Sequence, residues 1–471
     1  MSILHSAAFS ALPPLVVPPS IFRAYDIRGI AGDTLTIGNI EIIGRAMASL
    51  ALEEGEQTVL FGSDGRISSP ALRTALLKGI LSTGLNVIDL GTIPTPLLYF
   101  AAHTSEWGSG VMLTASHNPP DYNGIKIIRQ RTCLTPEQLQ HIRERADTGK
   151  FVTGKGSLTQ MDFKALYINR LRQDIHLRRK LKVVIDCANA VPALIAPELF
   201  EALGCEVVPL YCEMDGRFPN HHPDPTVADN MQDIIGAVRA HGADLGIALD
   251  GDGDRVVLVT NAGSVIDTDR LLMLLIKDIV PRYDSPNVVF DVKCSTLLSP
   301  LIRECGGRPV MSRSGHSFMK QKMHETGAVV GAEFSAHVFI KDRWYGYDDG
   351  MYVAARFLEL LSGQRHSAEE LLRALPQSIV TPELRIAVSD ENKFQLMERI
   401  KQLASFPQGT VNIMDGIRVD FADGWGLIRA SNTTPALLLR FEASNSKSLQ
   451  HIQAMFQGLL SQVDDMLKFD F

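Results

Sequence analysis

Three stretches of the chain repeat one pattern of apolar and polar positions. Each contains an apolar run, an aspartate at the end of that run, a polar loop, an amphipathic segment with helical spacing, and then glycine and a second apolar run. The steps from the aspartate to that glycine are similar: 20 residues from Asp64 to Gly84, 18 from Asp186 to Gly204, and 15 from Asp291 to Gly306. This spacing is typical of a β-α-β unit, whose helix crosses the sheet before the next strand begins. The pattern therefore predicts three related α/β domains.

The pattern changes after about residue 376. Short alternating segments with Asp-Gly turns follow, and helical stretches flank them at 391–403 and 446–467. Such segments are typical of antiparallel strands joined by tight turns. We therefore predict a smaller α+β fourth domain. The predicted domains are listed by residue: 1–160, 161–264, 265–376 and 377–471.

Composition narrows the class of partner. The 471 residues are too many for one core, and the net charge of −7 gives no reason to expect nucleic acid or an anionic membrane as a partner. The first 20 residues lack a basic start and are interrupted by prolines, and no later stretch has about 18 uninterrupted apolar residues, so neither a signal peptide nor a membrane span is expected. The six cysteines include no C-x-x-C pair, which indicates reduced thiols in a cytoplasmic protein.

A loop that follows the apolar run at 111–115 is the first candidate for chemistry. It begins with Ser116 and His117, continues through two prolines and a glycine that end regular structure, and reaches Lys126. We expect the Ser116 hydroxyl to be exposed at the end of a strand, within reach of His117 and Lys126. Serine needs a neighbouring base or cation to act as a nucleophile, and this loop supplies both. An ordinary polar turn is the alternative.

The loops after the other apolar runs are further candidates for functional residues, because open α/β sheets carry function at the carboxyl ends of their strands. The first repeat has Asp64, Arg66, Ser68 and Ser69 in this position, and the third has Lys293 and, after its last strand, His316. A solvated loop is the alternative reading for Lys293 and His316.

Asp250, Asp252 and Asp254 form an acidic triplet directly after an apolar run, with glycines between them. The glycines permit a tight turn, so three carboxylates can converge on one hard cation. A calcium loop of the EF-hand type is excluded, because its sixth position is Arg255 and its twelfth is Asn261. A hydrated acidic turn is disfavoured, because closely packed like charges need a cation. Magnesium fits best, since a phosphate oxygen can complete its shell.

Two further segments carry side chains that suit a sugar phosphate. Glu333, Ser335 and His337 alternate, so we expect them on one side of an extended segment, where they can hydrogen-bond a neutral polyhydroxy ligand. A loop after a later strand combines an arginine fork with hydroxyls and is a candidate phosphate cradle; its residues are Arg429, Ser431, Asn432, Thr433 and Thr434. A polar hairpin loop is the alternative for the second segment.

Together these motifs resemble a known family. FRAYDIRG at 22–29, TASHNPPDYNGIK, DGDGDR, the loop with Glu333, Ser335 and His337, and RASNTTP occur in the order found in the α-D-phosphohexomutases, most closely the bacterial phosphomannomutase/phosphoglucomutase group. The match extends from about residue 20 to residue 445. The resemblance implies three related α/β domains with mixed sheets and a smaller C-terminal α+β domain around a central cleft.

The resemblance also implies a reaction. Ser116 would be phosphorylated, and the acidic triplet would bind Mg²⁺ together with that phosphate. The phosphoryl group would pass to a hexose 1- or 6-phosphate, and the resulting 1,6-bisphosphate would turn over in the cleft and return its other phosphate to Ser116; glucose 1,6-bisphosphate would serve as activator. Closure of the fourth domain would keep this intermediate from escaping.

The implied roles follow motif by motif. Arg28, Lys126 and Arg255 would offset the charge of the transferring group, and His117 and Lys126 would move protons. The residues expected to hold the sugar and the second phosphate are Tyr25, Lys293, His316, Glu333, Ser335, His337, Arg429, Ser431, Asn432, Thr433 and Thr434. The partners implied are small hexose phosphates, for a monomer or small homo-oligomer.

The sequence departs from the group in one loop. Where the group commonly has G-E-M-S-G-H, Phe334 replaces methionine and Ala336 replaces glycine. Ala336 restricts the backbone and Phe334 adds bulk, which leaves the choice among mannose, glucose and glucosamine phosphates open. Two rivals to a mutase remain: a metal-dependent phosphatase that passes the phosphoserine group to water, and a non-catalytic sugar-phosphate or metal-binding protein.

Overall fold

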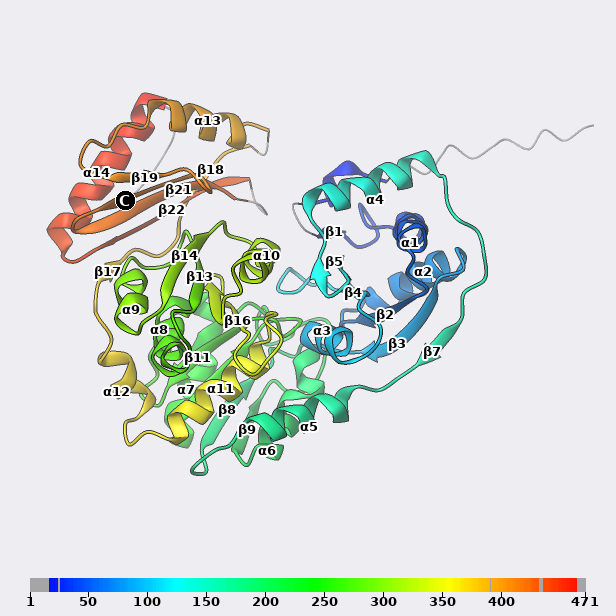
Figure 1. The fold of residues 1–471 in the computed structure, drawn as a ribbon, viewed down its shortest axis with the longest axis horizontal. Coiled ribbons are helices and arrows are strands. Elements are labelled where there is room, and N and C mark those ends of the chain that lie inside the picture. Colours follow the sequence, from blue (N-terminus) through cyan, green and yellow to red (C-terminus); the bar gives the residue numbers. More distant parts are fainter. Residues whose placement is uncertain (1–16, 24–25, 390, 432–434, 464–471) are drawn as a thin grey trace, which may run out of the picture.

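The structure is a computed structural model that describes residues 17–23, 26–389, 391–431 and 435–463. Its strands form four sheets, each from a successive part of the chain (Figure 1). The first three sheets contain both parallel and antiparallel pairs, and the fourth is antiparallel throughout the described strands. The predicted fold class, three α/β domains with mixed sheets and a smaller α+β domain, is confirmed.

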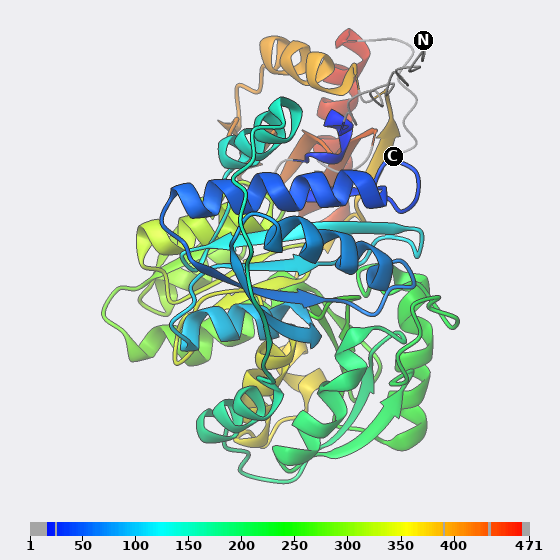
Figure 2. The same cartoon turned by 90° about the vertical axis from the view of Figure 1, so that its right-hand side faces the viewer.

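Sheet I has the strand order β1-β5-β4-β2-β3-β7, with β6 paired to β5. Helices α1 and α2 lie side by side over one face (Figure 2), and α3 covers the other. The elements are β1 (Ile27–Ile30), α1 (Ile37–Glu53), β2 (Thr58–Ser63), α2 (Ser69–Leu81), β3 (Asn86–Thr92), α3 (Thr95–Thr104), β4 (Gly110–Leu113), β5 (Tyr122–Arg129), β6 (Thr132–Cys133), α4 (Pro136–Thr148) and β7 (Leu158–Gln160).

Sheet II has the order β12-β11-β10-β8-β9. Strands β8, β9 and β10 are parallel, and β11 turns back on β10, so the acidic triplet lies in the tight connection between β10 and β11. The elements are α5 (Lys164–Asp174), β8 (Lys182–Asp186), α6 (Ala196–Ala202), β9 (Glu206–Leu210), α7 (Gln232–His241), β10 (Leu245–Leu249), β11 (Val256–Thr260) and β12 (Val265–Ile266).

Sheet III has the order β14-β13-β15-β16, with β15 and β16 joined as a hairpin. The elements are α8 (Thr268–Ile279), β13 (Asn287–Asp291), α9 (Leu298–Glu304), β14 (Arg308–Ser312), α10 (His316–Thr326), β15 (Val330–Glu333), β16 (His337–Ile340), α11 (Gly350–Ser362) and α12 (Ala368–Arg373). Short 3-10 turns occur at Pro19–Ile21, Val191–Leu194, Ala228–Met231 and Val280–Arg282.

Sheet IV has the order β17-β22-β21-β20-β19, with β18 paired to β22. The elements are β17 (Ile379–Val380), β18 (Leu384–Ala387), α13 (Lys393–Leu403), β19 (Thr410–Asn412), β20 (Ile417–Phe421), β21 (Gly424–Ala430), β22 (Ala436–Ala443) and α14 (Ser446–Val463). Among the helices of the described ranges, none is long and apolar enough to cross a membrane.

One apolar core runs through the first three domains. It joins α3 of sheet I to the helices and strands of sheets II and III. Aromatic rings connect the parts: Phe100 on α3 meets Tyr167 on α5 edge to face at 5.4 Å, and Trp344 stacks on Tyr352 of α11 at 4.1 Å. Because burial of such rings dominates the energetics of a core, these domains are held as one body.

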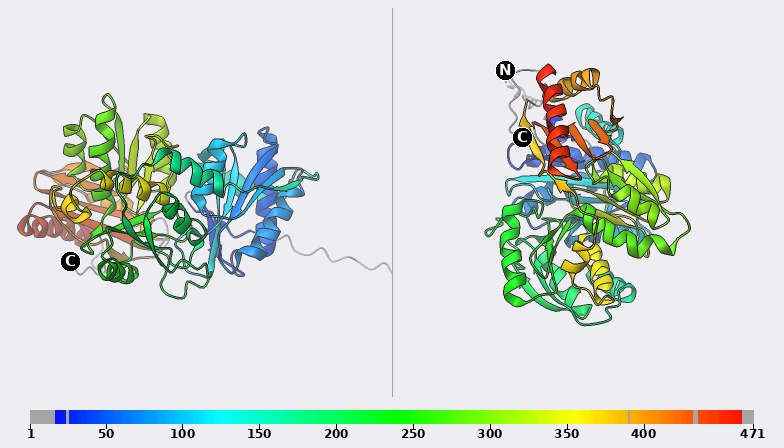
Figure 3. Two further views of the ribbon diagram at one scale, coloured as in Figure 1. Left: turned by 90° about the horizontal axis from the view of Figure 1, so that it is seen from below. Right: turned by 90° about the vertical axis from the view of Figure 1, so that its left-hand side faces the viewer.

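Sheet IV has a separate core beneath α13 and α14. Its contacts with sheet III are mostly polar: the Arg418 guanidinium donates to the backbone carbonyls of Val292 (2.6 Å) and Cys294 (2.8 Å), and Ser295 donates to Glu442 (2.6 Å). A small apolar cluster of Val292, Trp425 and Leu427 completes the contact. Sheet IV therefore lies against sheet III at one end of the molecule, while sheet I lies at the opposite end (Figures 1 and 3).

A buried carboxyl fixes α5 to the start of α11. Asp349 caps α11 by accepting the Tyr352 amide at 3.0 Å, and it accepts the Tyr167 hydroxyl at 2.8 Å. Burial raises the pKa of Asp349 to about 7, because the charged form loses its hydration. The folded protein therefore favours the protonated carboxyl, and this contribution to stability is lost as the pH rises through 7.

We expect Tyr167→Phe to lower the apparent free energy of unfolding by about 1–3 kcal/mol, because a buried acceptor loses its donor. The loss should be larger at pH 8.5 than at pH 5.5, since only the charged carboxylate depends strongly on that donor. Urea unfolding at both pH values measures the effect. The control is Tyr283→Phe, whose hydroxyl also donates to a carboxylate but whose side chain is 41% exposed. Equal losses in the two variants at both pH values would contradict the role given to Tyr167.

Candidate active site

All four domains contribute to a central cavity of about 180 Å³. The sheet loops that line it follow the carboxyl ends of β4, β10, β15 and β21. The lining residues are Arg28, Ser116, His117, Lys126, Asp224, Thr226, Arg255, Lys293, Ser314, Gly315, His316, Glu333, Ser335, His337, Glu383, Arg385, Arg429, Ser431 and Leu438. The structure thus brings together, around one space, twelve residues singled out in the sequence.

Ser116 lies just after β4 with its backbone in the left-handed region (φ 50°). Its Oγ donates to Asp250 Oδ2 at 2.7 Å and lies 3.1 Å from His117 Nδ1. The expectation of an exposed hydroxyl is wrong, because the residue is only 2% exposed. The triplet loop of sheet II covers it, a contact between segments 134 positions apart that no local pattern reveals.

Arg66 binds the backbone of the Ser116 loop. Its guanidinium donates to the backbone carbonyls of Ser116 and Asn118, both at 2.7 Å, and of Pro119 at 2.6 Å. Asp64 accepts from Nε at 3.1 Å and neutralises the buried charge. The sequence marked Arg66 as a loop residue, but its role as the backbone clamp of another loop was missed.

The acidic triplet is fully buried, and its carboxylate oxygens lie within 4.8 Å of one another. Asp252 Oδ1 and Asp254 Oδ1 accept no hydrogen bond from the described chain. Buried oxygens of this kind need a cation, because an unpaired buried carboxylate is costly. The triplet therefore fits a divalent metal, with Ser116 Oγ beside it.

Lys126 crosses from β5 to this triplet. Its ammonium donates to Asp252 Oδ2 at 2.7 Å and to Asp254 Oδ2 at 2.6 Å. Although burial alone would lower the pKa of Lys126, these carboxylates raise it above its ordinary value. Burial also tends to raise the pKa of Asp252, but the Lys126 charge outweighs it and holds that pKa at about 2. Lys126 therefore stays charged and stabilises the triplet.

The His117 side chain, in contrast to Lys126, is held in its uncharged form. Burial, followed by the charges of Arg255 and Arg28, lowers the pKa of His117 well below its ordinary value. The imidazole is therefore neutral at neutral pH and able to accept a proton from a hydroxyl nearby. Burial, followed by the charges of Asp252 and Asp254, raises the pKa of Asp250.

The two loops meet backbone to backbone. Gly251 lies so close to Ser116 that a Cβ on it would be 2.1 Å from the Ser116 carbonyl oxygen. Thr95, at the start of α3, donates from its amide and its hydroxyl to Asp252, at 2.9 and 2.6 Å. Only glycine allows this approach, so the position of the triplet against Ser116 depends on Gly251.

Glu333, Ser335 and His337 all reach the central cavity, but not from one extended segment. They belong to a hairpin in which Glu333 ends β15 and pairs with His337 at the start of β16. The expected alternation is wrong here, because residues 334–336 form a turn and Ala336 adopts φ 74°. The turn brings the Ser335 hydroxyl to donate to Glu333 Oε1 at 2.6 Å.

The two residues that depart from the family loop lie outside the lining of this cavity. The Phe334 ring stacks on the Arg440 guanidinium of sheet IV, 3.4 Å from ring centroid to Cζ. Ala336 is buried against sheet II, where its carbonyl accepts the Val256 amide at 3.2 Å. Both side chains therefore pack between domains.

A series of polar contacts that links Arg255, His337, Asp348 and Lys320 was not predicted from the sequence. His337 Nε2 accepts from Arg255 Nε at 3.0 Å, so the ring proton is on Nδ1, which lies 3.0 Å from Asp348 Oδ2. Lys320 in turn donates to Asp348 Oδ1 at 2.8 Å. Although burial would raise it, the charge of Lys320 together with the nearby His337 N–H holds the pKa of Asp348 well below its ordinary value. The adjacent Asp348 and Asp349, just before α11, were the sequence signal from which these contacts could have been predicted.

The phosphate cradle is described in part. Arg429 is the sixth residue of β21, rather than part of the loop after it, and its Nε donates to Asp415 Oδ2 at 3.2 Å. Ser431 follows the strand and lines the cavity. The predicted residues Tyr25, Asn432, Thr433 and Thr434 lie outside the described residues.

Other lining residues had no signal in the sequence. Asp224 and Thr226 come from the loop before α7, and Glu383 and Arg385 from the start of sheet IV. Each is a single polar residue in an ordinary segment. Arg28 was predicted, and it donates to Asn118 Oδ1 at 2.5 Å. With Arg255, Lys293, Arg385 and Arg429 it makes the cavity suitable for an anionic ligand.

Four family models match the chain in order. They are phosphoglucomutase/phosphomannomutase alpha/beta/alpha domain I at residues 19–153, domain II at 165–263, domain III at 267–379, and the C-terminal domain at 383–459. Together they cover most of the chain, and they confirm the resemblance stated from the motifs.

Similar proteins are found among curated sequences and solved structures. The phosphomannomutase/phosphoglucomutase of Pseudomonas aeruginosa is 51% identical over 455 residues, which are 97% of this chain and 98% of that protein. A phosphoglucomutase of Neisseria meningitidis is 45% identical over 93% of this chain and 96% of its own. A crystal structure of a phosphoglucomutase/phosphomannomutase family protein from Burkholderia thailandensis has a TM-score of 0.93 at 42% identity, covering 97% of this chain and all of that one.

We expect Gly251→Ala to weaken binding of a divalent cation at least tenfold, because the added methyl group forces the triplet away from Ser116. Mn²⁺ is a suitable probe, since its free ion gives an EPR signal that disappears on binding. Gly236→Ala is the matched control: a Cβ there meets nothing within 4 Å, and α7 gains a better helix former. Unchanged Mn²⁺ affinity in Gly251→Ala would show that this close approach does not shape the site.

Proposed function

Because the chain belongs to the phosphoglucomutase/phosphomannomutase family, we propose that it is a metal-dependent phosphohexomutase that interconverts hexose 1-phosphate and hexose 6-phosphate, with mannose and glucose as its sugars. One observation carries the proposal: the Ser116 hydroxyl lies against a buried carboxylate triplet, at the base of a cavity lined by cations from all four domains.

Ser116 is proposed as the carrier of the phosphoryl group. In the first step a sugar hydroxyl attacks the phosphorus of phosphorylated Ser116; the new P–O bond forms as the bond to Ser116 Oγ breaks, and the product is a hexose 1,6-bisphosphate. The hydroxyl proton passes to a base. In the second step Ser116 Oγ attacks the other phosphate, the proton returns to the leaving sugar oxygen, and the isomeric monophosphate is released.

The residues around Ser116 divide this work. Neutral His117, 3.1 Å from Ser116 Oγ, is suited to hold the proton of that hydroxyl. Lys126 was also a candidate for proton transfer, but its raised pKa suits charge stabilisation better. Arg28 and Arg255 add fixed positive charge where the transferring group becomes most negative.

Asp250, Asp252 and Asp254 would hold Mg²⁺, which would neutralise phosphoryl charge next to Ser116 Oγ. Asp252 Oδ1 and Asp254 Oδ1, which accept no hydrogen bond from the described residues, support this assignment. A bound 1,6-bisphosphate of glucose would act as activator, since its transfer of one phosphoryl group regenerates phosphorylated Ser116.

The far end of the cavity is proposed to bind the phosphate that does not react. Arg429, Ser431 and Arg385 come from sheet IV, and Lys293 and Ser314 come from sheet III. Glu333 and Ser335 line the same cavity, where their polar atoms can bind sugar hydroxyls. A bisphosphate that turns over would exchange its two phosphates between these ends, and closure of sheet IV would retain it.

The cellular setting is proposed from chemistry alone. We place the protein in the cytoplasm, where hexose phosphates occur, and the six free thiols are compatible with a reducing compartment. The residues quoted for the sugar and phosphate sites support small hexose phosphates as partners.

We expect Ser116→Ala to lower the rate of 1-phosphate to 6-phosphate conversion at least 1,000-fold, because the phosphoryl carrier is lost. A coupled assay with Mg²⁺ and a trace of glucose 1,6-bisphosphate measures the rate, and mass spectrometry of the wild type should find phosphate on Ser116. Ser461→Ala, at an exposed serine on α14, is the control. Full activity without Ser116, or inorganic phosphate released without isomerisation, would refute the mutase mechanism.

The loop that departs from the family gives a second test. We expect the double variant Phe334→Met, Ala336→Gly to change the ratio of mannose to glucose activity by less than about threefold, because neither side chain lines the cavity. The same assay on mannose, glucose and glucosamine 1-phosphates measures that ratio. A tenfold change, or turnover of the glucosamine substrate alone by the wild type, would overturn the sugar assignment.

A further inference from the structure

A second and larger cavity, of about 520 Å³, lies between domains I and III. Helix α3 and the β5–β6 hairpin form one wall, and α10 with the loop after β16 forms the other. It shares no lining residue with the central cavity. Its volume falls within the roughly 300–1,000 Å³ typical of small-molecule sites. We call it the basic cavity.

The charge of the basic cavity is of one sign. Arg131, Lys320 and Lys341 line it, and none of its lining residues, all of them described, is aspartate or glutamate. Lys320 is held by Asp348, which lies outside the lining. Arg131 and Lys341 are exposed and form no ion pair with a carboxylate in the described ranges. In a chain of net charge −7, such a space selects an anion.

The same cavity presents aromatic rings. Tyr345 and Tyr347 are parallel, with an interplanar angle of 2°, and the His103 ring lies 5.5 and 5.3 Å from them. Burial lowers the pKa of His103, so this ring is neutral, and its Nδ1–H donates to the Tyr99 carbonyl at 2.8 Å. Tyr347 is only 3% exposed, so the partly exposed rings of His103 and Tyr345 are the ones that offer a stacking surface for a flat heterocycle.

Two local features suggest that the cavity is adapted to a ligand. Gln130 and Arg131, in the β5–β6 turn, both have positive φ (48° and 67°), although such turns favour asparagine and glycine. Strained residues of this kind cluster at ligand sites. In addition, Ser317 lines the cavity and is only 7% exposed, and its buried hydroxyl has no hydrogen-bond partner within the described chain.

We propose that the basic cavity binds a nucleoside diphosphate. The phosphates lie at the rim, where Arg131 and Lys341 neutralise them, and the base lies against the partly exposed rings of His103 and Tyr345. The bound nucleotide lies beside Lys320, which reaches Asp348 and, through it, His337 of the central cavity. A ligand of this site must carry both negative charge and a flat ring. A hexose phosphate carries the charge but not the flat ring.

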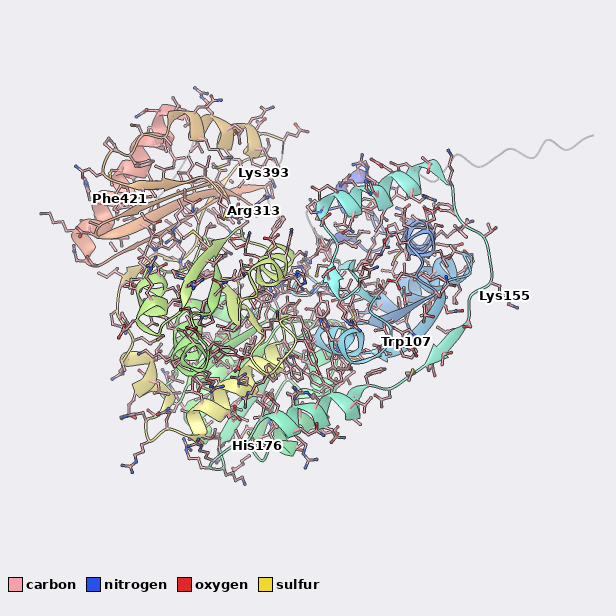
Figure 4. All side chains as sticks on the ribbon, viewed as in Figure 1. Trp107, Lys155, His176, Arg313, Lys393 and Phe421 are labelled. Atoms are coloured by element: carbon pink, nitrogen blue, oxygen red, sulfur yellow. The ribbon has the colours of Figure 1, made fainter. Side chains whose placement is uncertain are left out.

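The test is a calorimetric titration of the full-length protein with ADP, GDP and UDP, and with inorganic pyrophosphate as the probe without a base. We expect at least one nucleotide to bind, pyrophosphate to bind at least tenfold more weakly than that nucleotide, and Lys341→Glu to weaken nucleotide binding at least tenfold. The matched control is Lys155→Glu, an exposed lysine without a carboxylate partner in the described ranges, at the outer edge of domain I (Figure 4). Saturating glucose 1-phosphate should leave the nucleotide affinity unchanged within about twofold.

Four results would overturn the proposal. None of the three nucleotides binding at millimolar concentration would remove the site, and equal binding by Lys341→Glu and Lys155→Glu would place the nucleotide elsewhere. Displacement by glucose 1-phosphate would assign it to the central cavity. Pyrophosphate binding as tightly as the nucleotides would leave an anion site without a role for the rings. Because binding alone is measured, the outcome is independent of mutase activity.

Discussion

The burial of three carboxylates beside one lysine is the constraint on which the site depends. Isolated buried charges are costly, and they persist only when opposite charges and hydrogen bonds are supplied at short range. The acidic triplet belongs to sheet II, while Lys126 and Ser116 belong to sheet I, so Lys126 offsets part of the charge of the triplet only when the two sheets keep this relative position. The close approach of Gly251 and the hydrogen bond from the Thr95 amide to the Asp252 carbonyl fix that relative position at the backbone. The aromatic core joins these two sheets to sheet III, so the residues at the base of the central cavity hold fixed positions.

Much of the fold, and of the set of residues at the base of the central cavity, could be predicted from the sequence because the signals are local. The aspartate-loop-helix-glycine repeat follows from the geometry of a crossover, and three aspartates within five residues at the end of a strand favour a cation site. The environment of Ser116 could not be predicted in the same way. Its hydroxyl is buried by a loop 134 positions away, and its carbonyl is held by Arg66, 50 positions before it. Glu383 and Arg385 were missed for a related reason, since only the return of sheet IV toward sheet I brings them into the cavity.

The loop at 333–337 shows how a correct list of residues can come from a wrong picture of the backbone. Alternation predicted one extended segment, but the left-handed conformation of Ala336 closes a hairpin instead. The same three polar groups still face the cavity, because a turn of this length returns His337 opposite Glu333. The two unusual residues of the loop pack outward, Phe334 on Arg440 and Ala336 on sheet II. Their variation is therefore coupled to domain packing.

The separate core of sheet IV sets the thermodynamic character of any movement of that domain. The residues beneath α13 and α14 stay buried in such a movement, and the apolar groups it would expose to water are few: the cluster of Val292, Trp425 and Leu427, and the Phe334 ring that stacks on Arg440. Heat capacity changes in proportion to the apolar surface that becomes hydrated, so such a movement changes it little. Exchange of the Arg418 and Ser295 hydrogen bonds for bonds to water is then the main enthalpic event. The rate of opening should rise with temperature in a simple exponential way, without the curvature that accompanies folding.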